Sequence, residues 1–293
     1  SMNVKAYAKI NLCLDVKGRR DDGYHEVSMV MQQLALADDI TVEKRPDGQI
    51  LLTMEPEVEG IPTDGRNLMV KAAELFRSNC GIRDGVSMHL KKRIPSEAGL
   101  AGGSADAAAV LQGMNEIFGT GLSADELMAL GVRIGADVPF CILGGTALSE
   151  GIGEILTPLE IPADTLRPHV LLVKPRAGVS TAVMYRALDS CEMAFHPDTD
   201  AYVRALLDGG IPAAAPLTSN IFESVVVPQL PVIERIREDL SGSGAVAACM
   251  SGSGPTVFGL FEREEGMLCA AERIGRASYA DELAGIFPTG FRN

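Results

Sequence analysis

A glycine-rich segment that runs straight into an alanine-rich stretch constrains the fold of this chain more than any other feature. Residues 95–106 read Pro-Ser-Glu-Ala-Gly-Leu-Ala-Gly-Gly-Ser-Ala-Asp, and helically spaced apolar residues follow as far as Gly119. Glycine adopts backbone angles that other residues avoid and lets a ligand approach the main chain. The N–H groups and dipole at a helix start attract an anion. The segment is therefore either a tight turn or a phosphate-binding loop, and the helix after it favours the loop.

This loop differs from two common nucleotide-binding sequences. No Gly-Lys-Ser/Thr follows it, so it is not a P-loop, and its spacing does not match the Gly-x-Gly-x-x-Gly of dinucleotide-binding sheets. A lysine for phosphate chemistry must therefore come from another part of the chain. Ser104 has two open roles, as the cap of the following helix or as a metal contact through its hydroxyl.

Residues 4–16 alternate strictly between two kinds of side chain, as in a half-buried strand. Lys9 and Asn11 share the polar face and should point the same way, about 7 Å apart. Lys9 is therefore available to a phosphate. After this strand, an Asp-Asp-Gly turn should present Tyr24 and His25.

The remaining pattern mixes strands and helices without a regular βαβ rhythm, which predicts an α+β fold. Helices are expected after the caps Asn67 and Ser123, from about residue 180, and at 198–208 and 231–240. Strands are expected at 39–44, 50–54, 86–91, 169–174, 245–250 and 256–262. Prolines at 158, 162 and 168 mark a boundary, so we expect two domains, 1–160 and 161–293.

Composition excludes several classes of function. The net charge of −13 disfavours a nucleic-acid partner, which requires a positive surface, but permits an anionic small molecule bound by backbone N–H groups and a few cations. The six cysteines are widely spaced, without a Cys-x-x-Cys pair, which suits a reducing compartment. The N-terminal residues lack a signal pattern and no apolar run has membrane-spanning length. We expect a cytoplasmic protein without a membrane partner, as a monomer or weak homodimer.

Two further segments are weak candidates when each is taken alone. Met250-Ser-Gly-Ser-Gly-Pro255 lies between two short apolar strands, where a hairpin turn would also be rich in glycine and serine. Gly135-Ala-Asp-Val-Pro139 places Asp137 just past a helix, where most aspartates cap a helix or face solvent. Asp137 is nevertheless a candidate acid or base, and the second glycine segment gains weight only beside the first.

Taken together and in this order, four segments resemble the galactokinase, homoserine kinase, mevalonate kinase and phosphomevalonate kinase (GHMP kinase) superfamily. They are Lys9-x-Asn-Leu, the loop from Pro95 to Ser104, Gly-Ala-Asp137-Val-Pro, and Ser-Gly252-Ser-Gly. Residues 6–12 and 22–26 further resemble superfamily members whose acceptor carries cytidine diphosphate. Four segments in the right order are more specific than any one of them.

The resemblance implies a fold and a reaction. An N-terminal α/β domain, like domain 2 of ribosomal protein S5 and containing a left-handed crossover, would pair with a ferredoxin-like C-terminal domain, with the active site in the cleft between them. ATP would be the phosphoryl donor, and Ser104 would contact Mg²⁺. Asp137 would lie by the acceptor hydroxyl as general base, close to Lys9. The residues matching ATP-binding positions are Pro95, Gly99, Leu100, Ala101, Gly102, Gly103, Ser104, Asn67 and Lys92.

The same resemblance implies an acceptor site. Tyr185 matches a position whose ring stacks with that of Tyr24 around cytosine. Positions matching the acceptor-binding set are Asn11, Tyr24, His25, Asp137, Thr181, Tyr185, Gly252 and Ser253. Two residues depart from the family pattern. Ala101 stands where many relatives have glycine, so it either tolerates the same backbone angles or presents its N–H differently. Glu97 adds negative charge near the phosphates.

Two other functions remain open at this stage. One is a different kinase of the superfamily that acts on homoserine, mevalonate or a sugar, and the other is a nucleotide-binding protein without catalysis. The acceptor of such a kinase has no nucleobase for Tyr24, His25 and Tyr185 to bind. A protein without catalysis does not need both Lys9 and Asp137.

Overall fold

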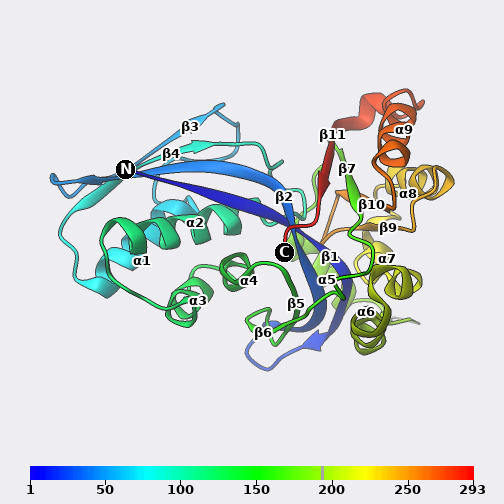
Figure 1. The fold of residues 1–293 in the computed structure, drawn as a ribbon, viewed down its shortest axis with the longest axis horizontal. Coiled ribbons are helices and arrows are strands. Elements are labelled where there is room, and N and C mark those ends of the chain that lie inside the picture. Colours follow the sequence, from blue (N-terminus) through cyan, green and yellow to red (C-terminus); the bar gives the residue numbers. More distant parts are fainter. Residues whose placement is uncertain (193–194) are drawn as a thin grey trace. The chain divides into compact units, whose positions relative to one another are not determined.

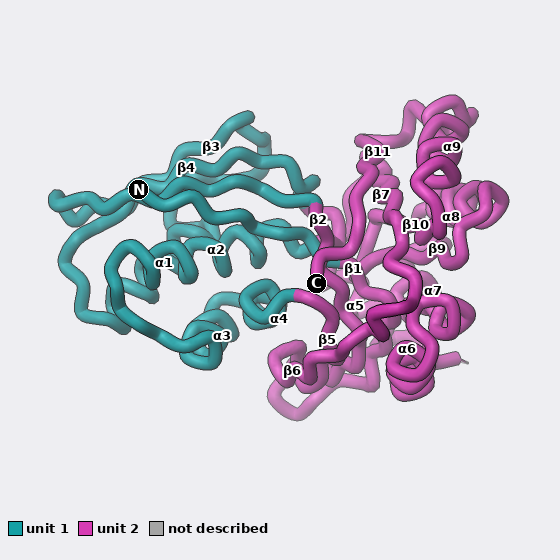
Figure 2. Tube along the Cα trace, in the orientation of Figure 1, with its two compact units in different colours: residues 1–9, 36–96, 101–144 teal, residues 10–35, 97–100, 145–293 magenta. Residues whose placement is uncertain are grey.

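The computed structural model describes residues 1–192 and 195–293, and these form two compact units (Figure 2). Unit 1 consists of residues 1–9, 36–96 and 101–144, and unit 2 of residues 10–35, 97–100 and 145–293. Strands β1 (Met2–Arg19) and β2 (His25–Arg45) each contribute to both units. The glycine-rich segment is also divided, because Glu97–Leu100 belongs to unit 2 and the helix after it to unit 1.

Unit 1 packs helices on one face of a sheet (Figure 1). Strand β3 (Ile50–Glu55) runs parallel to β4 (Gly85–Lys91), which pairs antiparallel with residues 39–45 of β2. The helices are α1 (Leu68–Cys80), α2 (Gly102–Ile117), α3 (Ala124–Val132) and α4 (Val138–Leu143). The shared core is aliphatic and rich in alanine, with Phe76 fully buried in it. Small side chains on α2 let the neighbouring elements approach closely.

Side-chain caps start two of these helices where the sequence predicts them. Asn67 accepts a hydrogen bond from the Met69 N–H at 2.8 Å, and Gly81 ends α1 in the left-handed conformation. Ser123 and Glu126 form a capping box at α3. Both predicted caps are confirmed.

Unit 2 contains a four-stranded antiparallel sheet in the order β11-β7-β10-β9. Its strands are β7 (His169–Pro175), β9 (Ala247–Met250), β10 (Val257–Phe261) and β11 (Leu283–Gly290). Helices α8 (Val232–Gly242) and α9 (Glu264–Gly275) lie beside this sheet (Figure 1). The buried side of α8 consists of Val232, Ile233, Ile236 and Leu240, whose helical spacing forms one apolar stripe.

The rest of unit 2 surrounds the far halves of the two long strands. Residues 13–14 of β1 pair in parallel with β8 (Ser219–Asn220), and residues 29–32 of β2 pair with β5 (Thr146–Glu150). Strand β6 (Ile155–Pro158) pairs antiparallel with β5. The helices here are α5 (Thr181–Asp189), α6 (Thr199–Ala214), α7 (Glu223–Val226) and the 3₁₀ turns Ala215–Leu217 and Ala280–Glu282.

The α+β prediction is confirmed, and each predicted strand and helix is present with shifted ends. The prediction that 4–16 is half-buried is wrong, because both faces are buried from Ala8 to Val16. The polar face is covered within unit 2, where Asn11 contacts Met29 and Asp15 pairs with His196. The linear domain boundary near residue 160 stays a prediction, since the compact units are interleaved along the chain. No helix among the described residues is long and apolar enough to cross a bilayer.

Candidate functional site

The glycine-rich segment forms an irregular loop in which several residues have positive φ. Gly99 has φ 81° and must be glycine, because a Cβ there would lie 2.1 Å from the Ser251 carbonyl oxygen. Ala101 adopts φ 55° and ψ 36° as the N-cap of α2. Of the two alternatives for Ala101, the structure shows the first: it takes the left-handed conformation itself, at a cost of about 1–2 kcal/mol.

The start of α2 has the properties of an anion site. No side chain caps this helix, so a ligand can meet the N–H groups of its first turn. Gly103 is exposed there and Gly102 is buried. The predicted capping role of Ser104 is wrong, because the helix begins at Gly102 and places Ser104 inside the first turn. Its metal role stays a prediction.

A fully buried serine in unit 2 fixes the first part of the loop. The Ser251 hydroxyl accepts a hydrogen bond from the Asn11 N–H at 3.2 Å and donates one to the Gly99 carbonyl at 2.9 Å. The Thr256 N–H donates to the Ala98 carbonyl at 3.2 Å. The second glycine segment therefore holds residues 98 and 99 through backbone and hydroxyl hydrogen bonds.

Asn220 in turn holds the second glycine segment. Its side-chain amide donates to the carbonyls of Met250 and Gly252, both at 2.8 Å, and Asn220 is almost fully buried. The hydroxyls of Thr181 and Ser253 lie 2.8 Å apart, which connects the start of α5 to the same turn. The sequence interpretation did not identify Asn220 or Ser251, because only the folded chain brings their partners to them.

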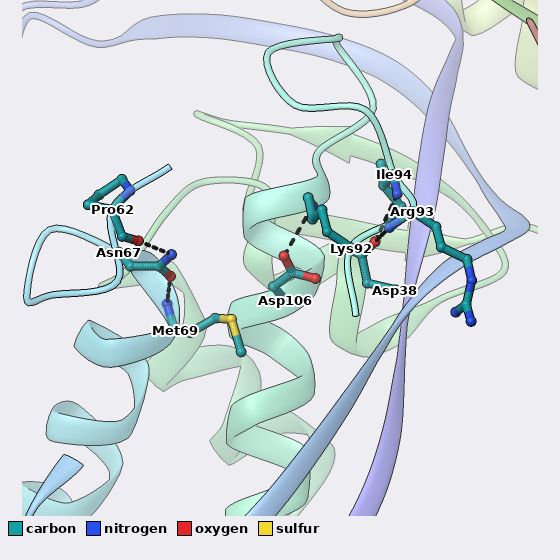
Figure 3. Close-up of polar contacts among 8 residues, drawn as sticks. All are labelled: Asp38, Pro62, Asn67, Met69, Lys92, Arg93, Ile94 and Asp106. Atoms are coloured by element: carbon teal, nitrogen blue, oxygen red, sulfur yellow. Dashed lines mark hydrogen bonds and ion pairs between the residues drawn. The ribbon is translucent and has the colours of Figure 1, made fainter. Parts of the chain in front are cut away.

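A buried cluster of charges lies in unit 1 (Figure 3). The Lys92 ammonium is 2.7 Å from an Asp38 oxygen and 3.2 Å from an Asp106 oxygen. These three side chains are 7%, 0% and 5% exposed. The other Asp38 oxygen accepts hydrogen bonds from the N–H groups of Arg93 and Ile94 at 2.6 and 2.8 Å. Asp38 thus receives three donors, whereas Asp106 receives one.

One ammonium cannot neutralise two buried carboxylates. Burial raises the pKa of Asp106 well above its ordinary value, Lys92 opposes this, and Asp38 adds to it. Among the described residues, the second Asp106 oxygen has no hydrogen-bond partner. Asp38 is therefore the carboxylate with more hydrogen-bond donors, and burial favours the neutral form of Asp106. Burial lowers the pKa of Lys92, but the two carboxylates outweigh this and raise it above its usual value.

The Lys92 ammonium of this cluster lies against the first turn of α2. A Cβ added to Gly102 would lie 2.9 Å from the Lys92 nitrogen, so glycine is needed here for close packing. Both polar atoms of the Asn67 side chain have partners in the structure. Its amide nitrogen donates to the Pro62 carbonyl at 2.8 Å, and its oxygen caps α1 (Figure 3). The adenosine-binding roles of Asn67 and Lys92 stay predictions.

The structure places Lys9 and Asp137 within unit 1. Lys9 is 4% exposed, and burial lowers its pKa, while the neighbouring Asp137 and Cys141 raise it. Asp137 occupies the N-cap position of α4 but makes no capping bond with its side chain. A Cβ on Gly135 would lie 3.9 Å from the Ser104 hydroxyl, so the turn carrying Asp137 also adjoins α2. A half-buried carboxylate that does not cap its helix is available for chemistry.

Three ring residues of unit 2, His25, Tyr185 and Phe222, pack on one another. The His25 ring stacks on Tyr185 with centroids 4.4 Å apart, and Tyr185 meets the edge of Phe222 at 5.0 Å. The His25 Nε2 lies 2.9 Å from an Asp189 oxygen. Tyr24 is 60% exposed. The pairing of Tyr24 with Tyr185 around a base stays a prediction, while Phe222 and Asp189 are neighbours that sequence reasoning missed.

A buried lysine lies near the extra charge of the loop. Lys174 is 8% exposed and donates to the Pro175 carbonyl at 3.0 Å. Burial lowers the pKa of Lys174, and Glu97 opposes that shift. A Cβ on Gly178 would lie 3.6 Å from a Glu97 carboxylate oxygen, so Glu97 packs on the segment after β7. The Lys174 ammonium offsets the negative charge that Glu97 brings to the loop.

Comparison with known proteins shows which proteins this chain is similar to. A model of the GHMP kinases N-terminal domain matches residues 67–145, and a model of the GHMP kinases C-terminal domain matches residues 202–279. The 4-diphosphocytidyl-2-C-methyl-D-erythritol kinase of Caldicellulosiruptor saccharolyticus is 47% identical over 93% of this chain and 92% of that protein. The enzyme of the same name from Lachnoclostridium phytofermentans is 48% identical over 93% of this chain and 90% of that protein.

Solved structures give the same result for the fold. A crystal structure of 4-(cytidine 5'-diphospho)-2C-methyl-D-erythritol kinase is 32% identical, with a TM-score of 0.79 over 100% of both chains. A homoserine kinase from Cytophaga hutchinsonii is 16% identical, with a TM-score of 0.74 over 99% of this chain and 95% of that one. At that identity the homoserine kinase shares the fold alone.

Replacing Ser251 with alanine should destabilise the protein by about 1–3 kcal/mol, because a buried N–H and a buried carbonyl lose their shared partner. Urea unfolding measures this free energy. The control is Ser241→Ala on the exposed side of α8, which should change it by less than about 0.5 kcal/mol. Equal effects of the two substitutions would contradict the role of Ser251.

Replacing Asp106 with asparagine should change how stability depends on pH. Because the folded-state pKa of Asp106 is raised, the wild type loses stability as pH rises from the ordinary aspartate pKa, about 4, towards the raised value. The amide needs no proton and avoids this loss. The unfolding free energy of Asp106→Asn relative to wild type should therefore improve by at least about 1 kcal/mol between about pH 5 and about pH 8.

Asp38→Asn is the matched control for that experiment. It removes the counter-ion of a buried ammonium and should cost about 3–5 kcal/mol throughout the pH range. A difference between Asp106→Asn and wild type that stays flat with pH would show that Asp106 is ionised in the folded protein.

Proposed function

This chain belongs to the family of 4-diphosphocytidyl-2-C-methyl-D-erythritol kinases within the GHMP kinases, and from that premise we propose how its residues perform the reaction. The enzyme transfers a phosphoryl group from ATP to the 2-hydroxyl of 4-diphosphocytidyl-2-C-methyl-D-erythritol, giving the 2-phosphate and ADP. This step belongs to the methylerythritol phosphate pathway of isoprenoid biosynthesis. One observation supports the residue assignment. The Asp137 side chain makes no capping bond to its helix and lies beside the buried Lys9 ammonium in the unit that contains α2.

The glycine-rich loop binds the phosphates of ATP in this proposal. The uncapped first turn of α2 supplies N–H donors, and its dipole favours negative charge. Lys92 adds a buried positive charge beneath that turn. The proposed ATP-binding set is Pro95, Gly99, Leu100, Ala101, Gly102, Gly103 and Ser104, with Asn67 and Lys92 on the adenosine side.

Magnesium would reach the site with the nucleotide. Among the described residues, no group of three or more His, Cys, Asp and Glu side chains is arranged to hold a metal ion. Mg²⁺ suits such a site, because it keeps several waters and binds phosphate oxygens with few protein ligands. Ser104 fits as a protein oxygen, since its hydroxyl lies in the first turn of α2 beside Gly135. When bound, the ion neutralises charge on the phosphates of ATP.

Asp137 and Lys9 act on the acceptor hydroxyl. Asp137 accepts the proton of the attacking alcohol, and the neighbouring Lys9 stabilises the negative charge on the transferred group. Burial makes the Lys9 charge depend on Asp137, because the carboxylate offsets part of the desolvation that lowers the lysine pKa. The two residues therefore work as a pair, and phosphoryl transfer otherwise needs mainly positioning.

Unit 2 binds the cytidine diphosphate end of the acceptor. Tyr185 offers a ring face for the base, and His25, held by Asp189, reads its polar edge. The exposed Tyr24 supplies the second ring. The remaining members of the set are Asn11, Thr181, Gly252 and Ser253. The Asn11 N–H donates to Ser251, the Gly252 carbonyl accepts from Asn220, and the hydroxyls of Thr181 and Ser253 lie 2.8 Å apart.

We place the reaction in the cytoplasm because all six cysteines are free thiols, which suits a reducing compartment. The oligomeric state, a monomer or weak homodimer, stays a prediction that sedimentation analysis tests.

Asp137→Asn should lower kcat at least about 10²-fold, the scale of general-base removal, while ATP binding is largely kept. Single-turnover kinetics and ATP titration separate the two effects. Asp125→Asn is the control, because Asp125 is an exposed acid in the first turn of α3. An unchanged kcat in Asp137→Asn would refute the assignment.

A substrate panel tests the function itself. With ATP and Mg²⁺, the protein should phosphorylate 4-diphosphocytidyl-2-C-methyl-D-erythritol and leave homoserine and mevalonate unchanged. Tyr185→Ala should raise KM for this acceptor at least about 10-fold, since stacking of a base is worth about 1–3 kcal/mol, whereas Tyr185→Phe keeps the ring. Turnover of homoserine or mevalonate alone would overturn the function, and a KM change confined to ATP would overturn the role of Tyr185.

A further inference from the structure

A separate cavity in unit 2 lies between α8 and the end of α9. Its volume is about 390 Å³, and three arginines line it. The lining residues that matter to the argument are Arg235, Asp239, Arg273, Arg276, Ser278 and Tyr279. None of them belongs to the proposed ATP or acceptor sites. Three guanidinium groups around one cavity are unexpected in a chain with a net charge of −13.

Arg235 is held in place without an acidic partner. Its guanidinium lies over the Tyr279 ring, 4.8 Å from the centroid, and donates to the Ser278 hydroxyl at 2.5 Å. Within residues 1–192 and 195–293, the structure contains no ion pair of Arg235. An aromatic ring orients an arginine without neutralising it, so its positive charge stays available to a ligand.

Both carboxylate oxygens of Asp239 already have partners in the cavity wall. One of its oxygens accepts the Tyr279 hydroxyl at 2.6 Å, and the other pairs with Arg273 at 3.3 Å. Tyr279 is 2% exposed, so this hydrogen bond ties the wall to the protein interior. Arg273 also donates to the Ser243 hydroxyl at 3.3 Å. Asp239 therefore orients Arg273 and Tyr279, and little of its charge opposes an incoming anion.

Arg276 completes the positive side of the cavity. It pairs with Glu272 one helical turn earlier at 2.7 Å, but the two side chains are 78% and 63% exposed. Exposed pairs of this kind contribute little and exchange partners easily. Glu238 is the other acid in the wall and is solvent-exposed. Arg276 can thus turn to a ligand at small cost, whereas Arg235 is already oriented by Tyr279 and Ser278.

We propose that this cavity binds a small phosphorylated metabolite through its phosphate or diphosphate group. Arginine forks bind phosphate oxygens in bidentate fashion, and a ring of them recognises a dianion better than scattered lysines do. A volume of about 390 Å³ is near the lower end for small-molecule pockets, which favours a small ester over a macromolecule. The site goes beyond the proposed function, because the reaction uses none of its residues.

Calorimetric titration with inorganic diphosphate, and separately with inorganic phosphate, tests the proposal. The full chain is first saturated with a non-hydrolysable ATP analogue, so that the glycine-rich loop is occupied. Diphosphate or phosphate should still bind, and Arg235→Gln and Arg276→Gln should each weaken that binding at least about 10-fold, as loss of a charge-assisted hydrogen bond does. The anion that binds more tightly shows whether the site prefers a phosphate or a diphosphate group.

Arg66→Gln is the control, because Arg66 is an exposed arginine that pairs with Asp64 in unit 1. It should leave anion binding unchanged. Turnover without added anion should be the same in Arg235→Gln as in wild type, so failure of the proposed function would be seen independently. Absence of anion binding in the saturated protein, or equal binding in both cavity variants and the control, would overturn the proposal.

Discussion

The close contact between Gly99 and the Ser251 segment sets the shape of the glycine-rich loop. The Ser251 carbonyl occupies the position that a Cβ on residue 99 would need, and the Ser251 hydroxyl bonds the Gly99 carbonyl. A loop of small residues has little packing of its own and would otherwise be mobile. Asn220 fixes the other side of that contact through two carbonyls of the second glycine segment. Residues 98 and 99 of the loop are therefore held in place by the second glycine segment.

Three buried lysines lie beside acidic side chains in this acidic chain. Lys9, Lys92 and Lys174 are all less than a tenth exposed, and each has acidic neighbours. A paired buried ammonium retains positive potential in a medium of low dielectric, whereas an exposed one is screened. The net charge of the whole chain thus says little about the potential at its sites. In the cluster of Asp38, Lys92 and Asp106, one ionised carboxylate already balances the charge of Lys92, and burial raises the pKa of Asp106 well above its ordinary value.

Much of this fold could be predicted because local patterns decide it. The caps at Asn67 and Ser123 and the alternation in β1 depend on neighbours within a few residues. The second buried face of β1 could not be predicted, since its covering residues, such as Met29 and His196, are distant in sequence. The sequence did not predict the contacts of Asp38, Asn220 and Lys174, because their partners are also distant in sequence. The family resemblance supplied roles for Lys9 and Asp137 that spacing alone left open.

The position of His25 bears on how the acceptor is selected. Asp189 holds one nitrogen of the ring, and Tyr185 covers one face. A histidine fixed in this way presents a defined donor or acceptor to a base, whereas a freely rotating one would pay an entropy cost on binding. Homoserine and mevalonate have no aromatic base to use this arrangement. The proposed acceptor site would therefore favour an alcohol that carries a nucleobase over smaller alcohols, because only a base can stack on these rings.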